Sequence, residues 1–345
     1  MRAVKLSGPG TLTLEDVPIP EPGPGQVRIK VTSAGLCQSD LHVLHMKDWP
    51  VRNMTMGHEG AGIIDAVAPD VSGPAVGDPV IVDLIWSCGQ CRPYVEGRGN
   101  ACAVAGSRTA FPTTPGLGPN GAMADYQVVP ARQTLPLQGL DPATAAPLGD
   151  AGVTPMHAIN TVRDRLIAGA TVVVIGVGGL GHLGVQILAA TTGARIVALD
   201  TDPAKVAAAA GHGAHLALPS GADAAARILA ETDGYGADVV LDFVGVQPTI
   251  DLAAATVAPE GAVRLVGLGG GRFPMSAVGD GTVLPWGVNV QRSYGGTRTD
   301  LLQVLALARG GRLRVDTVAY PLDEFQRAFD DLAAGRLSGR AVLIP

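Results

Sequence analysis

Aromatic residues are scarce in this 345-residue chain, where Phe, Trp and Tyr together make up only 4%. The apolar fraction still reaches 47%, so a core must be built mainly from Ala, Val, Leu and Ile. A chain above ~250–300 residues usually divides its core, and we therefore expect two domains.

Basic runs and long apolar runs are also missing. The net charge is −6 without a polybasic segment, which argues against nucleic acid or an anionic membrane surface as a partner. No segment offers ~18 uninterrupted apolar residues, and the N-terminus lacks the apolar stretch of a signal peptide. Three of only four cysteines lie between positions 88 and 102, which is no disulfide framework. These absences predict a cytoplasmic enzyme whose thiols are reduced or metal-bound.

Residues 171–190 carry a recognisable nucleotide-binding pattern. A β-branched run at 172–175 indicates a buried parallel strand, and Gly176, Gly178 and Gly181 follow at G-x-G-x-x-G spacing before an apolar helix. The first glycine permits a tight turn, the second lets backbone approach a pyrophosphate, and the third lets helix and strand pack closely. The alternative, in a chain with 47 glycines, is an ordinary strand–helix turn.

The second strand of this unit indicates which dinucleotide binds. It ends in Asp200, close to the interval expected for the ribose-binding acid. A carboxylate accepts hydrogen bonds from the ribose hydroxyls and repels a 2′-phosphate, and neither Thr201 nor Asp202 supplies a compensating cation. The sequence therefore favours NAD(H) over NADP(H).

The pattern of predicted secondary structure changes near residue 151. Short β-rich runs punctuated by Pro and Gly precede it, at 27–32, 61–67, 80–83 and 123–129. Afterwards strands alternate with helices as in a doubly wound parallel sheet, with strands expected at 171–176, 195–200, 216–218, 238–243, 262–267 and 288–294. Helices are expected between these strands, at 180–192, 203–211, 222–231 and 248–258. The tail, with helices at 300–309 and 323–334 and a strand at 341–344, is expected to rejoin the first domain.

Reactive side chains gather in two glycine-flanked motifs and one further position. Cys37 stands in GLCQSDLH, His58 in GHEG, and Asp150 just before the nucleotide-binding unit. Thiolate, imidazole and carboxylate are zinc ligands. Taken singly, Cys37 could be a small buried apolar residue and His58 an ordinary core histidine. Their joint occurrence predicts a metal site.

The motifs GLCQSDLH, GHEGAG, DAGVT from Asp150 and VIGVGGLGHLG resemble the medium-chain zinc-dependent alcohol dehydrogenase family, especially its bacterial NAD-dependent secondary-alcohol dehydrogenases. The resemblance covers essentially the whole chain. It implies an α/β protein with a GroES-like β-rich catalytic domain (1–151 and 294–345) and a Rossmann NAD-binding domain (152–293).

The resemblance also implies roles for individual residues. Cys37, His58 and Asp150 match the ligands of one catalytic zinc per subunit, with the fourth position open for substrate. Glu59 matches a carboxylate that approaches the metal in some states, and Asp40 one that holds His58. The expected coenzyme contacts are Thr154, Gly176, Gly178, Gly179, Leu180, Gly181, Asp200, Lys205 and Arg340, of which Lys205 has a solvated helix lysine as its alternative.

A metal matters because an alcohol is a weak acid. Its pKa lies near that of water, ~16, and direct transfer of the proton to a histidine of pKa ~6.5 costs about 12 kcal/mol. Zinc lowers the pKa of a bound hydroxyl group to around 7, after which hydride passes to the nicotinamide. Ser39 resembles the first hydroxyl of a proton relay and His42 its surface end. Alternatively, Ser39 caps a turn and His42 is merely solvated.

One segment departs from the family pattern. Relatives with a structural zinc carry four cysteines at C-x₂-C-x₂-C-x₇-C. Here Tyr94 stands in the third position, and the other three positions are Cys88, Cys91 and Cys102. A phenol must deprotonate from a pKa of ~10 to bind zinc. We therefore expect no structural zinc in this lobe, or a weakly held ion with a borrowed ligand. A disulfide is the alternative, disfavoured in the cytosol.

The sequence thus predicts a zinc-dependent oxidoreductase that interconverts secondary alcohols and ketones or aldehydes with NAD(H). The alternatives are a zinc-free medium-chain reductase of quinones, enones or imines, and a non-catalytic nucleotide-binding protein with a structural or sensing role. The resemblance implies a homo-oligomer, a tetramer in preference to a dimer. By analogy, the pocket for a small alcohol or ketone is lined by Trp49, Leu84, Trp86, Trp286 and Tyr294.

Overall fold

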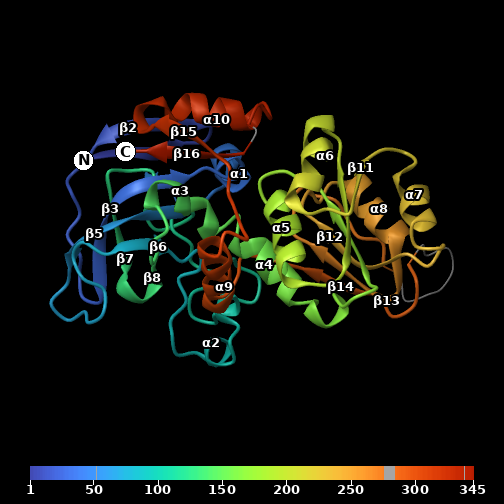
Figure 1. The fold of residues 1–345 in the computed structure, drawn as a ribbon. Helices are drawn as coiled ribbons and strands as arrows, with labels where there is room; N and C mark the ends of the chain where they lie inside the picture. The colour runs from blue at the N-terminus through green and yellow to red at the C-terminus, as the bar shows by residue number, and fades with distance from the viewer. Residues whose placement is uncertain (52, 276–283, 338) are drawn as a thin grey trace. The chain divides into compact units, whose positions relative to one another are not determined.

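The computed structural model describes residues 1–51, 53–275, 284–337 and 339–345. The chain forms two compact units, drawn in Figure 1. The first contains residues 1–153, 295–309 and 314–345, and the second contains residues 154–294 and 310–313. Within the described ranges, none of the helices has the length and hydropathy needed to cross a membrane.

The second unit is built on a six-stranded sheet in which every neighbouring pair of strands is parallel. Its spatial order is β11 (Leu216–Pro219), β10 (Arg195–Asp200), β9 (Thr171–Ile175), β12 (Ala237–Asp242), β13 (Val257–Leu265) and β14 (Asn289–Arg292). Numbered along the chain, the strand order is 3-2-1-4-5-6, which is the order of a Rossmann sheet. The chain adds strands on one side of β9 first and then on the other side, so the strand order reverses between β9 and β12. All five residues of β9 are buried, as a strand covered on both faces must be.

Helices flank this sheet and begin where the sequence provides start signals. They are α5 (Gly181–Thr191), α6 (Pro203–Ala209), α7 (Ala224–Ala230) and α8 (Gln247–Thr256). Pro203 occupies the first turn of α6, and the Asp202 carboxylate accepts from the Ala204 N–H, capping the helix. The doubly wound architecture predicted for this region is confirmed, although the strand predicted at 288–294 is only Asn289–Arg292.

In the residues that the structure describes, the first unit forms two sheets and lacks the α/β alternation of the second unit. The larger sheet runs β15 (Thr317–Pro321), β16 (Arg340–Ile344), β3 (Gln26–Gly35), β5 (Glu59–Val67), β6 (Pro79–Val82) and β8 (Thr134–Pro136), with β7 (Tyr126–Pro130) also paired to β3. A smaller sheet joins β2 (Thr11–Asp16), β1 (Arg2–Gly8) and β4 (Met54–Thr55). The β-rich organisation is thus confirmed.

One strand prediction was wrong in its start. The strand expected at 123–129 begins at Tyr126, because the preceding residues are engaged by β1. Met123 accepts a backbone hydrogen bond from Val4, and Ala124 forms a bridge with Ala3. The two strands β1 and β2 themselves were not among the predicted elements.

The C-terminal segment closes the first unit. After α9 (Arg298–Arg309) and α10 (Phe325–Ala333), β16 pairs antiparallel with β3, and the Leu36 N–H donates to the Ala341 carbonyl. Phe329 of α10 is buried in the same apolar cluster as Leu36. The tail therefore packs on the first unit, and it brings Arg340 next to the segment that carries Cys37.

Candidate metal and coenzyme sites

The sheet register of the first unit brings the predicted metal ligands together. Cys37 follows β3 as the N-cap of α1 (Gln38–His45), and His58 directly precedes β5. In the β3–β5 ladder, Gly35 lies opposite Glu59, so the two motifs leave the sheet at the same place. Asp150 follows the short 3₁₀ turn Ala146–Gly149, which packs on β3, β5 and β6.

The ligand atoms of this cluster fit a zinc ion. Cys37 Sγ lies 3.3 Å from Asp150 Oδ2, and His58 Nε2 lies 3.5 Å from the same oxygen. Ligand atoms of Cys37, His58, Glu59 and Asp150, all buried, lie within 4.8 Å of one another. Zinc bond lengths of ~2.0–2.3 Å give tetrahedral ligand–ligand distances of about 3.3–3.8 Å, so the donors are already spaced for the ion.

The carboxylate of Asp40 contacts two of these ligand residues. Its Oδ2 accepts the Cys37 N–H at 2.9 Å, and its Oδ1 lies 3.3 Å from His58 Nδ1. The Asp40 side chain is completely buried. Contact of Nδ1 with this carboxylate turns Nε2 of His58 toward Cys37 and Asp150, the orientation that a metal-binding imidazole requires.

A buried ion pair lies on the other side of the cluster. The guanidinium group of Arg340 contacts Glu59 Oε1, and both residues are at least 96% inaccessible to solvent. Burial raises the pKa of Glu59 to about 8, although Arg340 opposes this change. Burial alone would lower the pKa of His58, but Asp40 and Asp150 raise it well above its usual value. Acidic groups outnumber cationic groups in this buried cluster, and a divalent cation would balance them.

Arg340 and Gly35 are the parts of this site whose position the sequence did not reveal. The resemblance implies a coenzyme contact for Arg340, which stays a prediction, and in the structure its guanidinium pairs with Glu59. A Cβ atom on Gly35 would overlap Glu59 Oε2. The facing pair Gly35 and Glu59 could have been found only from the strand register, which the separate motifs do not contain.

Ser39 and His42 lie on α1, beside the cluster. Ser39 is half-buried with its Oγ 3.7 Å from Cys37 Sγ, and His42 is exposed one helical turn further on. This order, from a half-buried hydroxyl to an exposed imidazole, is what a proton path to the surface requires. Their relay roles stay predictions.

In the second unit, the three glycines of the nucleotide motif occupy the conformations that their predicted tasks require. Gly176 has φ +84°, in the left-handed region. A Cβ atom on Gly178 would meet no atom within 4 Å, so the space beside it is open for a phosphate. A Cβ atom on Gly181 would overlap the Gly176 carbonyl oxygen, which shows how tightly α5 packs on the loop. These features are what a cradle for a dinucleotide pyrophosphate requires, and the coenzyme-binding role of the loop stays a prediction.

The other predicted coenzyme residues surround this loop or begin the unit. Asp200 ends β10, and its carboxylate accepts the N–H groups of Val177 at 2.8 Å and Asp202 at 3.0 Å. Lys205 Nζ lies 3.8 Å from Asp202 Oδ2. Two other predicted coenzyme residues, Gly179 and Leu180, are half-buried just before α5. Thr154 is buried in α4 (Val153–Asn160).

The predicted pocket residues are divided between the two units. Trp286 is 84% exposed on the second unit. Trp49 and Trp86 in the first unit have buried indole nitrogens without a hydrogen-bond partner. Leu84 is buried, and Tyr294 ends the second unit. Their contact with substrate stays a prediction.

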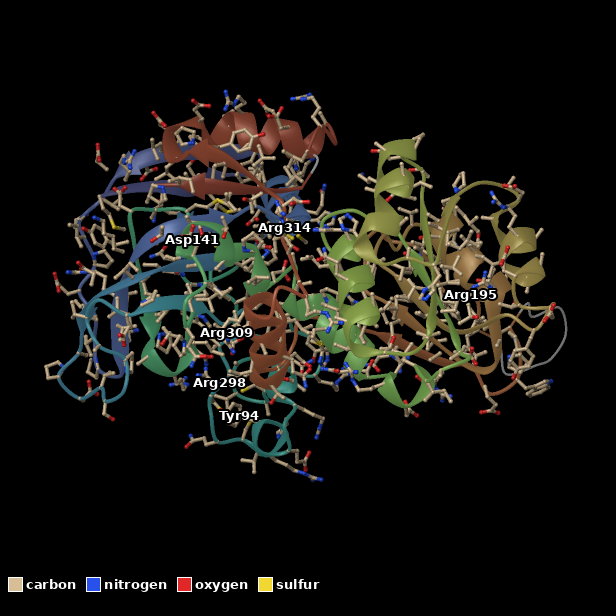
Figure 2. The ribbon with its side chains drawn as sticks, viewed as in Figure 1. Tyr94, Asp141, Arg195, Arg298, Arg309 and Arg314 are labelled. Atoms are coloured by element: carbon tan, nitrogen blue, oxygen red, sulfur yellow. The ribbon has the colours of Figure 1, made fainter. Side chains whose placement is uncertain are left out.

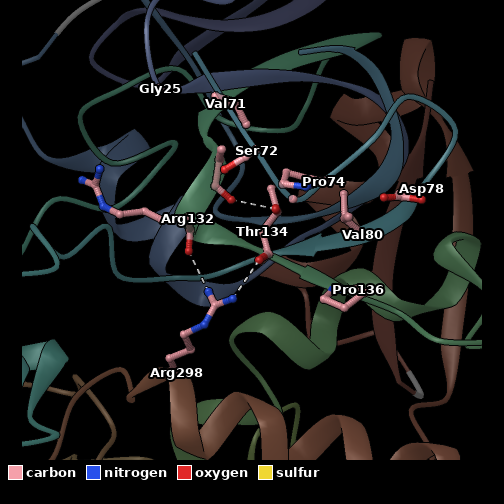
Figure 3. A pocket seen from close by; sticks show the side chains of 12 residues that line it. Gly25, Val71, Ser72, Pro74, Asp78, Val80, Arg132, Thr134, Pro136 and Arg298 are labelled. Atoms are coloured by element: carbon pink, nitrogen blue, oxygen red, sulfur yellow. Dashed lines mark hydrogen bonds between the residues drawn. The ribbon is translucent and has the colours of Figure 1, made fainter. Parts of the chain in front are cut away.

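Two further features of the first unit lie apart from the metal-ligand cluster. Cys88, Cys91 and Cys102 form a second cluster, in the lobe that carries Tyr94 and α2 (Arg92–Val95; Figure 2). Burial would raise the pKa of Cys102, but N–H groups including those of Cys88 and Ala105 lower it to about 7. A cavity of about 520 Å³ has Arg298 among its lining residues, and this side chain donates to the carbonyls of Arg132 and Thr134 (Figure 3). None of the predicted site residues lines it.

Comparisons with known proteins point to one family. The alcohol dehydrogenase GroES-like domain model matches residues 23–139, and the zinc-binding dehydrogenase model matches residues 179–309. A D-arabinose 1-dehydrogenase (NADP(+)) of Saccharolobus solfataricus is 34% identical over 99% of this chain and 96% of its own. An NAD-dependent alcohol dehydrogenase of Sulfurisphaera tokodaii is 33% identical, covering 100% and 99%. The crystal structure of the alcohol dehydrogenase from Aeropyrum pernix superimposes with a TM-score of 0.91 at 31% identity, over 100% of both chains.

Proposed function

This chain belongs to the family of zinc-binding alcohol dehydrogenases with a GroES-like domain, and from that premise we propose which residues carry its reaction. It is an NAD-dependent oxidoreductase that interconverts alcohols and carbonyl compounds. In our proposal the catalytic domain comprises residues 1–151 and 294–345, and the coenzyme-binding domain comprises residues 152–293.

Cys37, His58 and Asp150 are the proposed ligands of one catalytic zinc ion. The observation that carries this proposal is the spacing of Sγ, Nε2 and Oδ2 at 3.3 and 3.5 Å inside a buried cluster. A bound zinc supplies Lewis acidity that makes a hydroxyl group acidic at neutral pH. Glu59 stands beside these ligands as a further carboxylate, held on its other side by Arg340.

Side chains of the protein orient the ligands and carry the proton. Asp40 orients His58 and Cys37 through one carboxylate. Ser39 receives the proton that the substrate hydroxyl loses, and His42 passes it to solvent from the exposed side of α1. Burial of the ligands excludes bulk water and strengthens the electrostatic interactions around the reacting oxygen.

Coenzyme binding is assigned to the loop of Gly176, Gly178 and Gly181, with Gly179 and Leu180 at the helix start. The free N–H groups there favour the pyrophosphate. Asp200 binds the adenosine ribose and disfavours a 2′-phosphate, while Thr154, Lys205 and Arg340 make additional contacts. We propose a preference for NAD(H), although a relative of this chain is named for NADP(+).

The substrate class, assembly and location complete the proposal. An aspartate as third ligand resembles the secondary-alcohol dehydrogenases, and we propose secondary alcohols and ketones as substrates. We propose a homotetramer as the assembly, and light scattering tests this by measuring the molar mass in solution. A cytosolic location fits four cysteines that are all free thiols.

The deciding experiment combines metal analysis with ketone reduction by NADH and NADPH. We expect one zinc ion bound through Cys37. We also expect activity to disappear on exhaustive chelation and to return when zinc is added. Full ketone or enone reduction by the metal-free protein would instead identify a zinc-free reductase. Coenzyme binding without turnover on any carbonyl substrate, by zinc-loaded protein, would indicate a non-catalytic nucleotide-binding protein.

A matched pair of glycine variants tests the coenzyme site separately. Gly178→Ala places a methyl group in the open space beside the loop and is expected to weaken NADH binding by about 10–100-fold without lowering thermal stability. Gly211→Ala, also in open space but after α6, is the control and should leave NADH affinity unchanged. Equal NADH affinity in wild type and Gly178→Ala, measured by fluorescence titration, would contradict the assignment.

A further inference from the structure

The lobe between β6 and β7 holds three thiols whose sulfur atoms face one another. Cys91 Sγ lies 3.7 Å from Cys102 Sγ, and the sulfurs of Cys88, Cys91 and Cys102 are all within 4.8 Å of one another. Zinc–sulfur bonds of ~2.3 Å give sulfur–sulfur distances of about 3.8 Å around a tetrahedral ion. The observed spacing therefore suits three sulfur ligands of a single cation.

Backbone N–H groups point at two of the sulfurs. The Cys91 N–H donates to Cys88 Sγ at 3.3 Å, and the N–H groups of Cys88 and Ala105 donate to Cys102 Sγ, each at 3.3 Å. Gly89, at φ +82°, provides the turn inside Cys88-Gly-Gln-Cys91. Donors aimed at sulfur stabilise negative charge there, as metal-bound thiolates require.

A fourth ligand is missing from this cluster. Among the described residues, no other Cys, His, Asp or Glu joins the group of three. Tyr94 stands three residues after Cys91, and its ring carbon Cδ2 lies 3.4 Å from where a Cβ atom on Gly99 would stand. A neutral phenol with a pKa near ~10 is a poor zinc ligand. The donor set therefore does not fit the closed four-ligand site of a structural zinc.

We propose that Cys88, Cys91 and Cys102 form an open three-thiolate site for one thiophilic divalent cation, whose fourth ligand is an exchangeable small molecule such as water or a small thiol. Soft sulfur ligands select zinc and cadmium over magnesium or calcium. Cys88 and Cys91 are only half-buried, so an external ligand reaches the ion from solvent. The site is separate from the Cys37 cluster and takes no part in the proposed reaction.

Cadmium titration of the metal-depleted full-length protein tests the proposal, because thiolate-to-cadmium charge transfer absorbs in the ultraviolet in proportion to the number of sulfur ligands. Three thiolates are expected to bind one ion beyond the ion at Cys37, and a small thiol such as 2-mercaptoethanol should increase this absorbance. Cys102→Ser should remove most of the added signal. Cys88→Ser, at a half-buried position, is the second variant should Cys102→Ser fail to fold.

Two variants of Tyr94 sharpen the test. Tyr94→Cys should close the site, abolish the response to 2-mercaptoethanol, and slow metal loss to a chelator by at least about tenfold. Tyr94→Phe should behave as the wild type. A change of spectrum in Tyr94→Phe would show that the phenol is the fourth ligand and overturn the open-site proposal. Binding of no ion beyond that at Cys37, or a disulfide between Cys91 and Cys102 in protein purified under reducing conditions, would also overturn it.

Discussion

The two cysteine clusters of the first unit are assembled in different ways. Cys88, Cys91 and Cys102 come from one segment of fifteen residues, and their sulfurs receive N–H groups of the same loop. Cys37 and Asp150, by contrast, are 113 residues apart, and they meet because the 3₁₀ turn Ala146–Gly149, which precedes Asp150, packs on β3 and β5. The local cluster is half-exposed and made of one donor type, whereas the long-range cluster is buried and combines thiol, imidazole and carboxylate. Burial of the long-range cluster excludes bulk water and strengthens the electrostatic interactions that a chemical step uses.

The largest effect should come from breaking the long-range cluster. We expect Cys37→Ser to lower kcat/KM by at least about 10³-fold, since a metal ion supplies several kcal/mol of transition-state stabilisation. Cys88→Ser is the matched control in the local cluster, and its folded protein should keep turnover close to wild type. Steady-state kinetics with metal analysis checks both variants. Turnover of Cys37→Ser within tenfold of wild type would contradict the assignment.

A smaller loss is expected when the carboxylate behind the ligands is neutralised. Asp40→Asn keeps the shape of the side chain but removes the charge that faces His58 Nδ1 and accepts from the Cys37 N–H. Zinc affinity should fall by about 10–100-fold, measured by competition with a chromophoric chelator. Asp48→Asn, at an exposed position, is the control. Equal affinities in the two variants would mean that Asp40 does not position the ligands.

The register that joins the long-range cluster can be tested at Gly35. In Gly35→Ala the new methyl group would overlap Glu59 Oε2, so one strand or the carboxylate must shift. We expect a loss of about 1–3 kcal/mol, seen as a lower Tm in calorimetry. Gly8→Ala in β1 is the control, because its Cβ atom would meet only Thr11 Oγ1, at 4.0 Å. A Tm unchanged in both variants would show that the facing pair tolerates the methyl group.

An effect that depends on pH is expected at Asp83, in the segment that connects β6 with the cysteine lobe. Burial raises the pKa of Asp83 to about 7, against the opposing effect of Arg298. The unfolded carboxyl group ionises near ~4, so between pH 4 and 7 the folded state holds the extra proton and stability falls as the pH rises, by at most ~1.4 kcal/mol per unit. Asp83→Asn removes this dependence.

The gain in Tm of Asp83→Asn over wild type should therefore be larger at pH 8 than at pH 5. Thermal unfolding at the two pH values checks this expectation. Asp78→Asn, on a partly exposed carboxylate just before β6, is the control and should show the same difference from wild type at both pH values. A gain that is larger at pH 5 would contradict the direction of the pKa change.

Local patterns predicted much of the second unit. The strand at 195–200 and the helix starting at 203 were predicted from local runs that alternate between strand and helix patterns, and the structure confirms both. Each of these signals acts over one or two turns of chain, where neighbouring residues decide the backbone conformation. The strand at 123–129 was predicted by the same reasoning, but pairing with distant β1 shortened it.

What the sequence determined by itself is therefore the set of donors, the glycine loop and the three-cysteine lobe, because each lies within a short segment. Only the tertiary structure decided that Gly35 faces Glu59 and that Arg340, arriving on the last strand, pairs with that carboxylate. The physical reason is that strand register and burial arise from contacts between segments far apart in the chain. Those contacts also set the pKa of Glu59 and the spacing of Cys37, His58 and Asp150.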